Sequence, residues 1–196
     1  MSVPYTRMGN DAILRAVVRL IATRGPEQTS VRNVASEAGV SIGAVQHHYR
    51  TKDDLLLAAM RGLNAEFITR MQEILAEIPD AKQRLRAFIH AISAVDSEAR
   101  DGAIIWTVFA ARSCVHQGLR TEHSENWAHV EEYIFALMVE AFPGCGIVRD
   151  DAAYLLALAD GIAVARAAEN NERMTEQRAA SILDTALKQF EQRKQS

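Results

Sequence analysis

Residues 31–49 contain two stretches that each fit a helix of about eight residues, joined by a turn of about three residues. Two helices of this length cannot bury a core between themselves, so they have to pack at a steep angle against a third helix. Ala35 is small enough for the point where the helices cross, and Gly39 can adopt the left-handed backbone of a tight turn. The segment therefore predicts a helix-turn-helix. The apolar side chains expected to fill its angle are Val34, Val40, Val45 and Tyr49.

The rest of the chain also has the periodicity of helices. Apolar residues recur three and four positions apart, no run alternates as in a strand, and Gly and Pro gather at boundaries such as Gly25-Pro26 and Pro143-Gly144. We predict an all-α protein with nine helices. A three-helix head would span residues 1–52, a linking helix 51–78 would follow, and residues 53–196 would form a helical body. The expected helices span about residues 10–23, 31–38, 42–49, 51–78, 80–96, 101–117, 120–141, 149–170 and 174–193.

The charge of the chain is unevenly distributed. Residues 1–52 contain seven Lys and Arg residues against three acids, whereas the whole chain has a net charge of −3. A polyanion would therefore bind the head rather than the body. No apolar run approaches the roughly 18–20 residues that span a bilayer, and the N-terminus lacks the apolar segment of a signal peptide. We expect a cytoplasmic protein with no membrane partner.

The second short helix has an outward face without acidic side chains, and such a helix can enter the major groove of duplex DNA. Gln46 could pair with adenine there, while Ile42 and Ala44 could touch a thymine methyl group. The remaining expected DNA-contacting residues, most of them facing phosphates, are Thr29, Ser30, Arg32, Ser41, Gly43, His47, His48, Tyr49 and Lys52.

Metal binding and catalysis fit the sequence less well than DNA binding does. His47 and His48 are adjacent, so on a helix they point about 100° apart and converge poorly on one ion. His116 and His123 are separated by a break expected near Gly118. We expect no metal and no cofactor. An all-helical enzyme is an alternative without a nucleophile–base pair or a phosphate loop to support it, and an effector-independent architectural DNA-binding protein is a second alternative.

Three segments of the head resemble the DNA-binding domain of the TetR family of bacterial regulators: residues 29–35, 38–45 and 48–56. The resemblance is dense over residues 8–60. It implies a homodimeric transcriptional regulator, a repressor that binds a near-palindromic operator and is released by a small-molecule effector. One position departs from the family, which commonly has tyrosine where this chain has Gln46. The glutamine amide could read a base where the tyrosine would contact a phosphate.

The body has its own, looser resemblance, to the choline-responsive BetI-type branch of that family. The residues that carry it are Trp106, Phe109, Ala110, Ala111, Leu119, His123 and Trp127. A pocket among these helices is one interpretation of their large apolar residues, and a plain hydrophobic core is the other. The expected pocket residues are Phe88, Ile92, Trp106, Phe109, His123, Trp127, Ile134 and Met138. Polar residues that could orient a ligand are His90, Thr107, His123 and Asn126.

The last two expected helices are candidates for a dimer interface. The first is rich in alanine, and small side chains allow helices to approach closely. The second has an apolar stripe, which could instead be buried within one chain. The resemblance implies that two copies of this helix pair form a four-helix interface. The expected interface residues are Ala157, Gly161, Val164, Ile182, Ala186 and Phe190.

Overall fold

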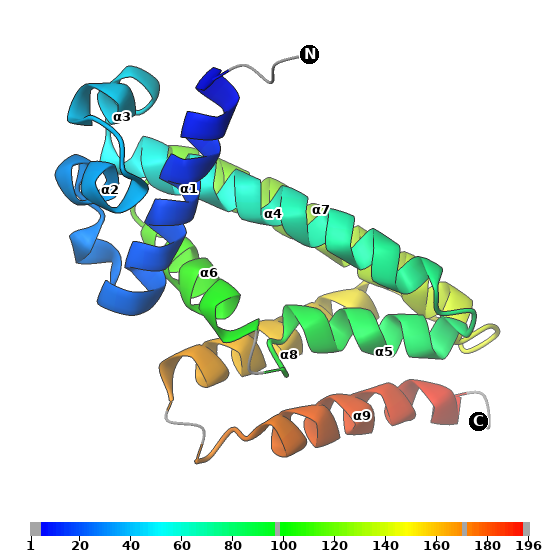
Figure 1. The fold of residues 1–196 in the computed structure, drawn as a ribbon. Coiled ribbons are helices and arrows are strands. Elements are labelled where there is room, and N and C mark those ends of the chain that lie inside the picture. Colours follow the sequence, from blue (N-terminus) through cyan, green and yellow to red (C-terminus); the bar gives the residue numbers. More distant parts are fainter. Residues whose placement is uncertain (1–4, 97–98, 170–171, 194–196) are drawn as a thin grey trace.

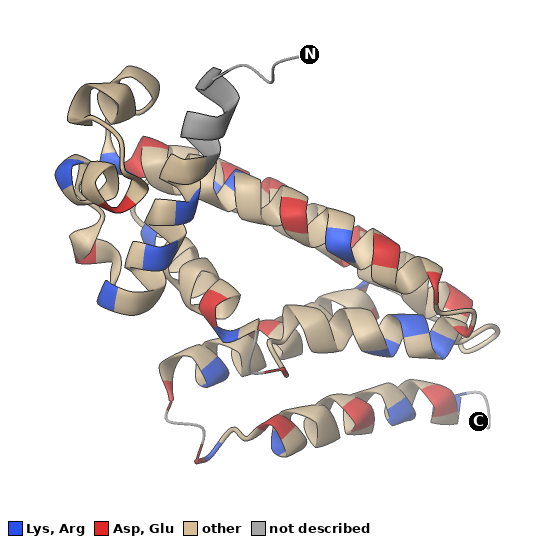
Figure 2. Ribbon diagram, in the orientation of Figure 1, with Lys and Arg blue, Asp and Glu red and all other residues tan. Residues whose placement is uncertain are grey.

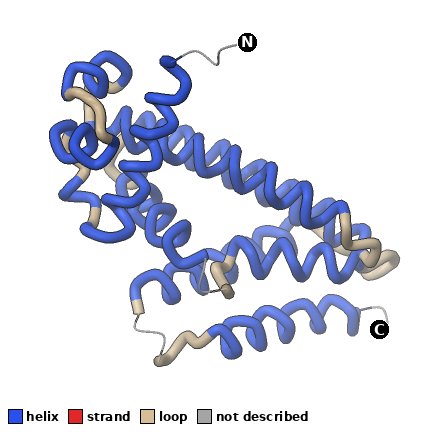
Figure 3. The backbone as a smooth tube through the Cα atoms, viewed as in Figure 1, coloured by secondary structure: helices blue, strands red, loops and turns tan. Residues whose placement is uncertain are grey.

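Helices make up the architecture of the described part of the chain (Figures 1 and 3). The computed structural model describes residues 5–96, 99–169 and 172–193, with side chains from residue 12 onward. Within these residues there are nine α-helices, one short 3-10 helix and no strand, which confirms the predicted all-α fold. The elements are α1 (Tyr5–Arg24), η1 (Pro26–Gln28), α2 (Val31–Ala38), α3 (Ile42–His48), α4 (Lys52–Ala76), α5 (Ala81–Ile92), α6 (Arg100–Ser113), α7 (Gln117–Ala141), α8 (Arg149–Ala168) and α9 (Glu176–Gln192).

The first three helices form the predicted helix-turn-helix head. The Ser30 hydroxyl accepts the Asn33 N–H at 3.2 Å and the Ser41 hydroxyl accepts the Ala44 N–H at 3.1 Å, so side chains cap α2 and α3 at their starts. Gly39 ends α2 with φ of 68°, a left-handed conformation that glycine adopts without strain. The apolar side chains buried in the head are Ile13, Ala16, Val17, Leu20, Ile21, Val34, Ala35, Val45 and Tyr49.

The long helix α4 leads from the head into the body. A capping box starts it: the Asp54 N–H donates to Thr51 Oγ1 at 3.0 Å, and the Thr51 N–H donates to Asp54 Oδ2 at 2.9 Å. Further along α4, the Arg61 guanidinium donates two hydrogen bonds to the Glu122 carboxylate of α7. These contacts fix the start of α4 and bind a residue of its first half to α7.

Helix α5 ends at Ile92, four residues before its predicted end. The Ser93 hydroxyl donates to the Ile89 carbonyl at 2.7 Å, and Ala94 adopts a left-handed φ of 50°. Arg166 of α8, which is buried, donates from Nε to the Ala94 carbonyl. The helix therefore stops because a side chain 72 residues away binds the turned backbone, and local periodicity does not encode that contact.

The described residues form two large hydrophobic cores and a small cluster of buried alanines, Ala94, Ala103, Ala163 and Ala167. One lies within the body, between α5, α7, α8 and α9. The other contains the buried side chains of the head together with Ile105 and Phe109 of α6 and Leu119 of α7. Helix α6 packs against α1 and α4 on one side and against α8 on the other (Figure 1). The head is thus joined to the body by a continuous core, to which α4, α6 and α7 all contribute side chains.

The charges follow the predicted asymmetry in part. Figure 2 shows Lys and Arg on α1 and α2, whereas along α4 and α9 acids alternate with Lys and Arg. Within residues 5–96, 99–169 and 172–193, no helix combines the length and the apolar character needed to cross a membrane.

Candidate nucleic-acid interface and aromatic cluster

Helix α3 presents most of its side chains to solvent. Of its seven residues only Val45 is buried, where it anchors the helix to the head core. Ile42, the first residue of the helix, is 47% exposed. Gln46, His47 and His48 are also exposed. The structure therefore places Ile42 and Gln46 on an accessible, acid-free surface, whereas Ala44 is half-buried.

Most of the expected phosphate-contacting residues lie around that surface. Ser30, Arg32, Ser41 and Lys52 are exposed on α2, α3 and α4 or at their N-termini. Lys52 is the first residue of α4, and its Nζ lies 3.8 Å from a Glu27 carboxylate oxygen, beyond ordinary hydrogen-bond distance.

Thr29 and Tyr49 are corrections to the expected set. Thr29 is only 3% exposed, and its hydroxyl donates to the Pro26 carbonyl, so it holds η1 in place and does not face outward. Tyr49 is 8% exposed and packs in the head core. Both residues build the head, and we remove them from the proposed DNA contacts.

Four of the expected pocket residues meet in the body and form what we call the aromatic cluster: Trp106 and Phe109 of α6 with His123 and Trp127 of α7. The rings of Trp106 and Trp127 are stacked, with centroids 3.9 Å apart and planes 13° apart. The His123 ring lies 5.0 Å from that of Trp106, and burial lowers the pKa of this histidine, which favours its neutral form.

The sequence did not indicate Asp160, which adjoins this cluster from α8. The Trp127 indole N–H donates to Asp160 Oδ2 at 2.5 Å. Burial raises the pKa of the Asp160 carboxyl to about 6, although the Trp127 hydrogen bond opposes the rise. The sequence contains one weak indication of its role, because Asp160 is the only charged residue between Asp151 and Arg166, in an otherwise apolar stretch. Asn126, next to Trp127 on α7, has a buried amide nitrogen without a hydrogen-bond partner.

The other expected pocket residues belong elsewhere. Phe88, Ile134 and Met138 are buried in the body core, and Ile92 packs against it, so for these four the interpretation as core is correct. Thr107 donates its hydroxyl proton to the Ala103 carbonyl of the same helix at 2.8 Å, so it has no proton left to donate to a ligand. The remaining candidate, His90, lies on α5 with Nε2 3.6 Å from Asp184 of α9.

The expected dimer residues divide between the two helices. Ala157, Gly161 and Val164 are exposed along α8. Ala186 and Phe190 of α9 are 3% and 2% exposed and lie in the core of a single chain, with Ile182 packed against it. The apolar stripe of α9 is therefore used within the protomer, and Ala186 and Phe190 cannot form an intermolecular surface.

Two family models match the chain. Residues 13–59 match "Bacterial regulatory proteins, tetR family", and residues 81–190, more than half of the chain, match "BetI-type transcriptional repressor, C-terminal". The chain belongs to the TetR family. The proteins of this family are transcriptional regulators and not enzymes, so the enzyme alternative is set aside.

Curated relatives of this TetR-family chain match about half of its sequence. The HTH-type transcriptional regulator PksA of Bacillus subtilis (strain 168) is 31% identical over 99 residues, which are 50% of this chain and 48% of that protein. The chain thus spans about half the length of the curated relatives it matches.

Two solved structures share the fold. A transcriptional regulator from Rhodococcus sp. Rha1 has a TM-score of 0.81 and 28% identity, covering 93% of this chain and 96% of that one. A putative transcriptional regulator from Saccharomonospora viridis, solved in complex with choline, has a TM-score of 0.80 and 22% identity, covering 91% and 95%.

Proposed function

We propose that this TetR-family chain is a dimeric transcriptional repressor of the cytoplasm, which binds a near-palindromic operator through α3 and is released by a small organic cation. The exposed, acid-free face of α3 carries the DNA-binding part of the proposal. Gln46 would read a base, Ile42 and Ala44 would contact thymine methyl groups, and Lys52 would contact a phosphate. The other proposed contacts are Ser30, Arg32, Ser41, Gly43, His47 and His48.

The exposed face of α8 would form the dimer interface. Ala157 and Gly161 would allow two copies of α8 to approach closely, with Val164 and the 47% exposed Tyr154 beside them. A two-fold axis there would present two copies of α3 to successive major grooves, about 34–36 Å apart or slightly more, on one face of the duplex.

The aromatic cluster, with Asp160 beside it, would be the effector site. Indole faces attract cations within about 6 Å, and a partly buried carboxylate adds an opposite charge. Choline in the Saccharomonospora viridis regulator supports this class of ligand. The stacked rings of Trp106 and Trp127 leave no gap between them, so the cation would have to separate α6 from α7 as it enters.

Helix α6 would carry that displacement to the head. It holds Trp106 at the proposed effector site, and near its C-terminal end Arg112 binds Asp53 of α4 through two hydrogen bonds of 2.9 and 3.1 Å. Asp53 is the second residue of α4 and follows α3 closely. A tenfold weakening of operator binding requires about 1.4 kcal/mol of coupling between the two sites.

The effector proposal is tested by fluorescence anisotropy on labelled duplex from the region upstream of the gene. Choline is expected to release the protein, and 3,3-dimethyl-1-butanol, its neutral carbon analogue, is not. Asp160→Asn should bind the DNA as the unmodified chain does but resist release by choline. Equal release by both compounds, or release of the variant at the same choline concentration, would contradict a cation site at Asp160.

A further inference from the structure

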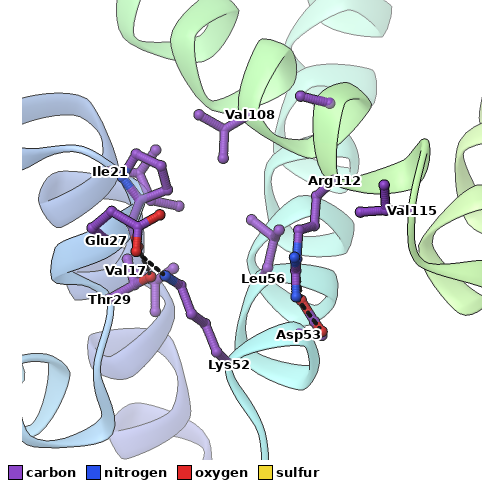
Figure 4. Close-up of a pocket in the computed structure, with 12 residues that line it drawn as sticks. Val17, Ile21, Glu27, Thr29, Lys52, Asp53, Leu56, Val108, Arg112 and Val115 are labelled. Atoms are coloured by element: carbon purple, nitrogen blue, oxygen red, sulfur yellow. Dashed lines mark hydrogen bonds and ion pairs between the residues drawn. The ribbon is translucent and has the colours of Figure 1, made fainter.

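A cavity lies between the head and the body, and it shares no residue with the aromatic cluster. Its volume is about 470 Å³, within the range of roughly 300–1,000 Å³ typical of small-ligand sites. It lies between α1, η1, the first turns of α4 and the last turns of α6 (Figure 4). We call it the head–body cavity. The residues that line it are Val17, Ile21, Pro26, Glu27, Thr29, Lys52, Asp53, Leu56, Val108, Ala111, Arg112 and Val115.

The walls of the head–body cavity are largely apolar. Val17 and Ile21 of α1, Leu56 of α4 and Val108 of α6 supply branched side chains from both sides. Val115, which follows α6, is 75% exposed. A branched apolar side chain this exposed leaves an unsatisfied hydrophobic edge at the cavity mouth, which an apolar ligand would cover.

The charged groups around the head–body cavity form one strong and one weak ion pair. Both Asp53 oxygens bind Arg112, and this guanidinium lowers the pKa of the Asp53 carboxyl, so the two charges neutralise each other. Lys52, by contrast, has its ammonium 3.8 Å from Glu27, whose side chain is 91% exposed. Figure 4 shows Lys52 extending toward Glu27 across the cavity. An exposed pair at this distance contributes little, so the Lys52 ammonium can turn to another anion at small cost.

We propose that the head–body cavity binds a carboxylate with a short apolar chain, with the chain among Val17, Leu56 and Val108 and the carboxylate on Lys52. The apolar walls would accept the chain of an amphipathic anion, and the weakly paired Lys52 ammonium at the edge would accept its charge. A cationic ligand would find Asp53 already paired and Glu27 fully hydrated. Binding would also compete with DNA, because Lys52 is a proposed phosphate contact; this consequence rests on the proposed function, whereas the site itself does not.

The site is tested on the full chain with octanoate as the probe, by isothermal titration calorimetry and ligand-observed NMR. We expect octanoate to bind with a dissociation constant at or below about 1 mM, and 1-octanol and octylamine to bind at least about tenfold more weakly. Lys52→Gln should weaken octanoate binding by about tenfold. The matched control Arg50→Gln removes an exposed cation that does not line the cavity and should leave octanoate binding unchanged.

Two further variants test the apolar part of the cavity. Ala111→Trp should fill it and abolish binding. Val115→Asp, at an exposed position that tolerates a charge, should weaken octanoate binding by about tenfold, and the control Val139→Asp, at a 47% exposed valine of α7, should not. Circular dichroism confirms that each variant is folded. Octanoate binding that survives both Lys52→Gln and Val115→Asp, or that is lost in Trp127→Phe, would overturn the head–body cavity as the site.

Competition with DNA separates this inference from the proposed function. Octanoate should raise the dissociation constant for operator duplex, and the effect should disappear in Val115→Asp. Octanoate binding with unchanged DNA affinity would overturn the competition while leaving the repressor proposal intact. A chain that binds octanoate at this cavity but binds no duplex would support the site and refute the repressor proposal.

Discussion

Replacing Asp160 by asparagine should stabilise the protein at neutral pH, because the substitution removes a charge that is costly to bury. Asparagine keeps an oxygen that can accept the Trp127 indole N–H. The pKa of Asp160 rises from 3.8 to about 6, an interval that corresponds to about 3 kcal/mol at 25 °C. The carboxyl is only partly buried, so solvent screening reduces the expected gain to about 1–2 kcal/mol.

The pH dependence follows from the sign of the shift. A carboxyl whose pKa is raised by folding binds its proton more tightly in the folded state, so the unmodified chain loses stability as pH rises from about 4 to about 6. The gain from Asp160→Asn should therefore be complete above pH 7. At pH 4.5 it should fall to about a third of that value, because most of the folded chains then carry a protonated Asp160.

Urea unfolding at pH 7.5 and pH 4.5 measures both effects, at one protein concentration because the stability of a dimer depends on it. Glu73→Gln, which removes an exposed acid from α4, is the matched control and should change the unfolding free energy by less than about 0.5 kcal/mol at either pH. A stabilisation by Asp160→Asn of the same size at both pH values, or none at pH 7.5, would refute the reasoning about burial.

Three other predictions concern the proposed effector site, helix α3 and the buried Arg166. Choline affinity should fall about tenfold between pH 7.5 and pH 5, because a cation binds the carboxylate form of Asp160; a flat calorimetric profile would contradict this. Gln46→Ala should cost about 1–3 kcal/mol at one base pair in competition binding and alter sequence preference, whereas equal losses on every duplex would contradict base reading. Arg166→Met should lower the unfolding free energy by about 2–4 kcal/mol, because it removes the donor to two buried carbonyls, those of Ala94 and Met174, while the exposed Arg173→Met should cost less than about 0.5 kcal/mol.

The head could be predicted closely from the sequence because its structure is specified locally. Ser30 and Ser41 cap helices that begin at the next residue, and Gly39 alone supplies the left-handed turn between them. Val34 and Val45 are buried as the spacing indicated. The caps and the turn depend on residues at most a few positions apart, which is the range over which periodicity and capping act, and the buried valines then pack against α1.

The structure of the body was less predictable, because contacts between residues far apart in the sequence determine where its helices end and which side chains meet. The bond from Arg166 to the Ala94 carbonyl ends α5, and the bond from Trp127 to Asp160 joins residues 33 positions apart. The apolar stripe of α9 was visible in the sequence. The stripe alone does not determine whether it is buried within one protomer or against a second copy. Here the body of one protomer covers Phe190.

Two copies of α3 are proposed to read successive major grooves, and footprinting of the full chain on the DNA upstream of its gene can detect this arrangement. We expect two protected half-sites of related sequence, on one face of the duplex, with centres about one helical turn apart or slightly more. Gln46→Ala should weaken protection of both half-sites, and the control Gln72→Ala, at an exposed position of α4, should not. Uniform protection without half-sites, or protection of a single half-site, would contradict the account.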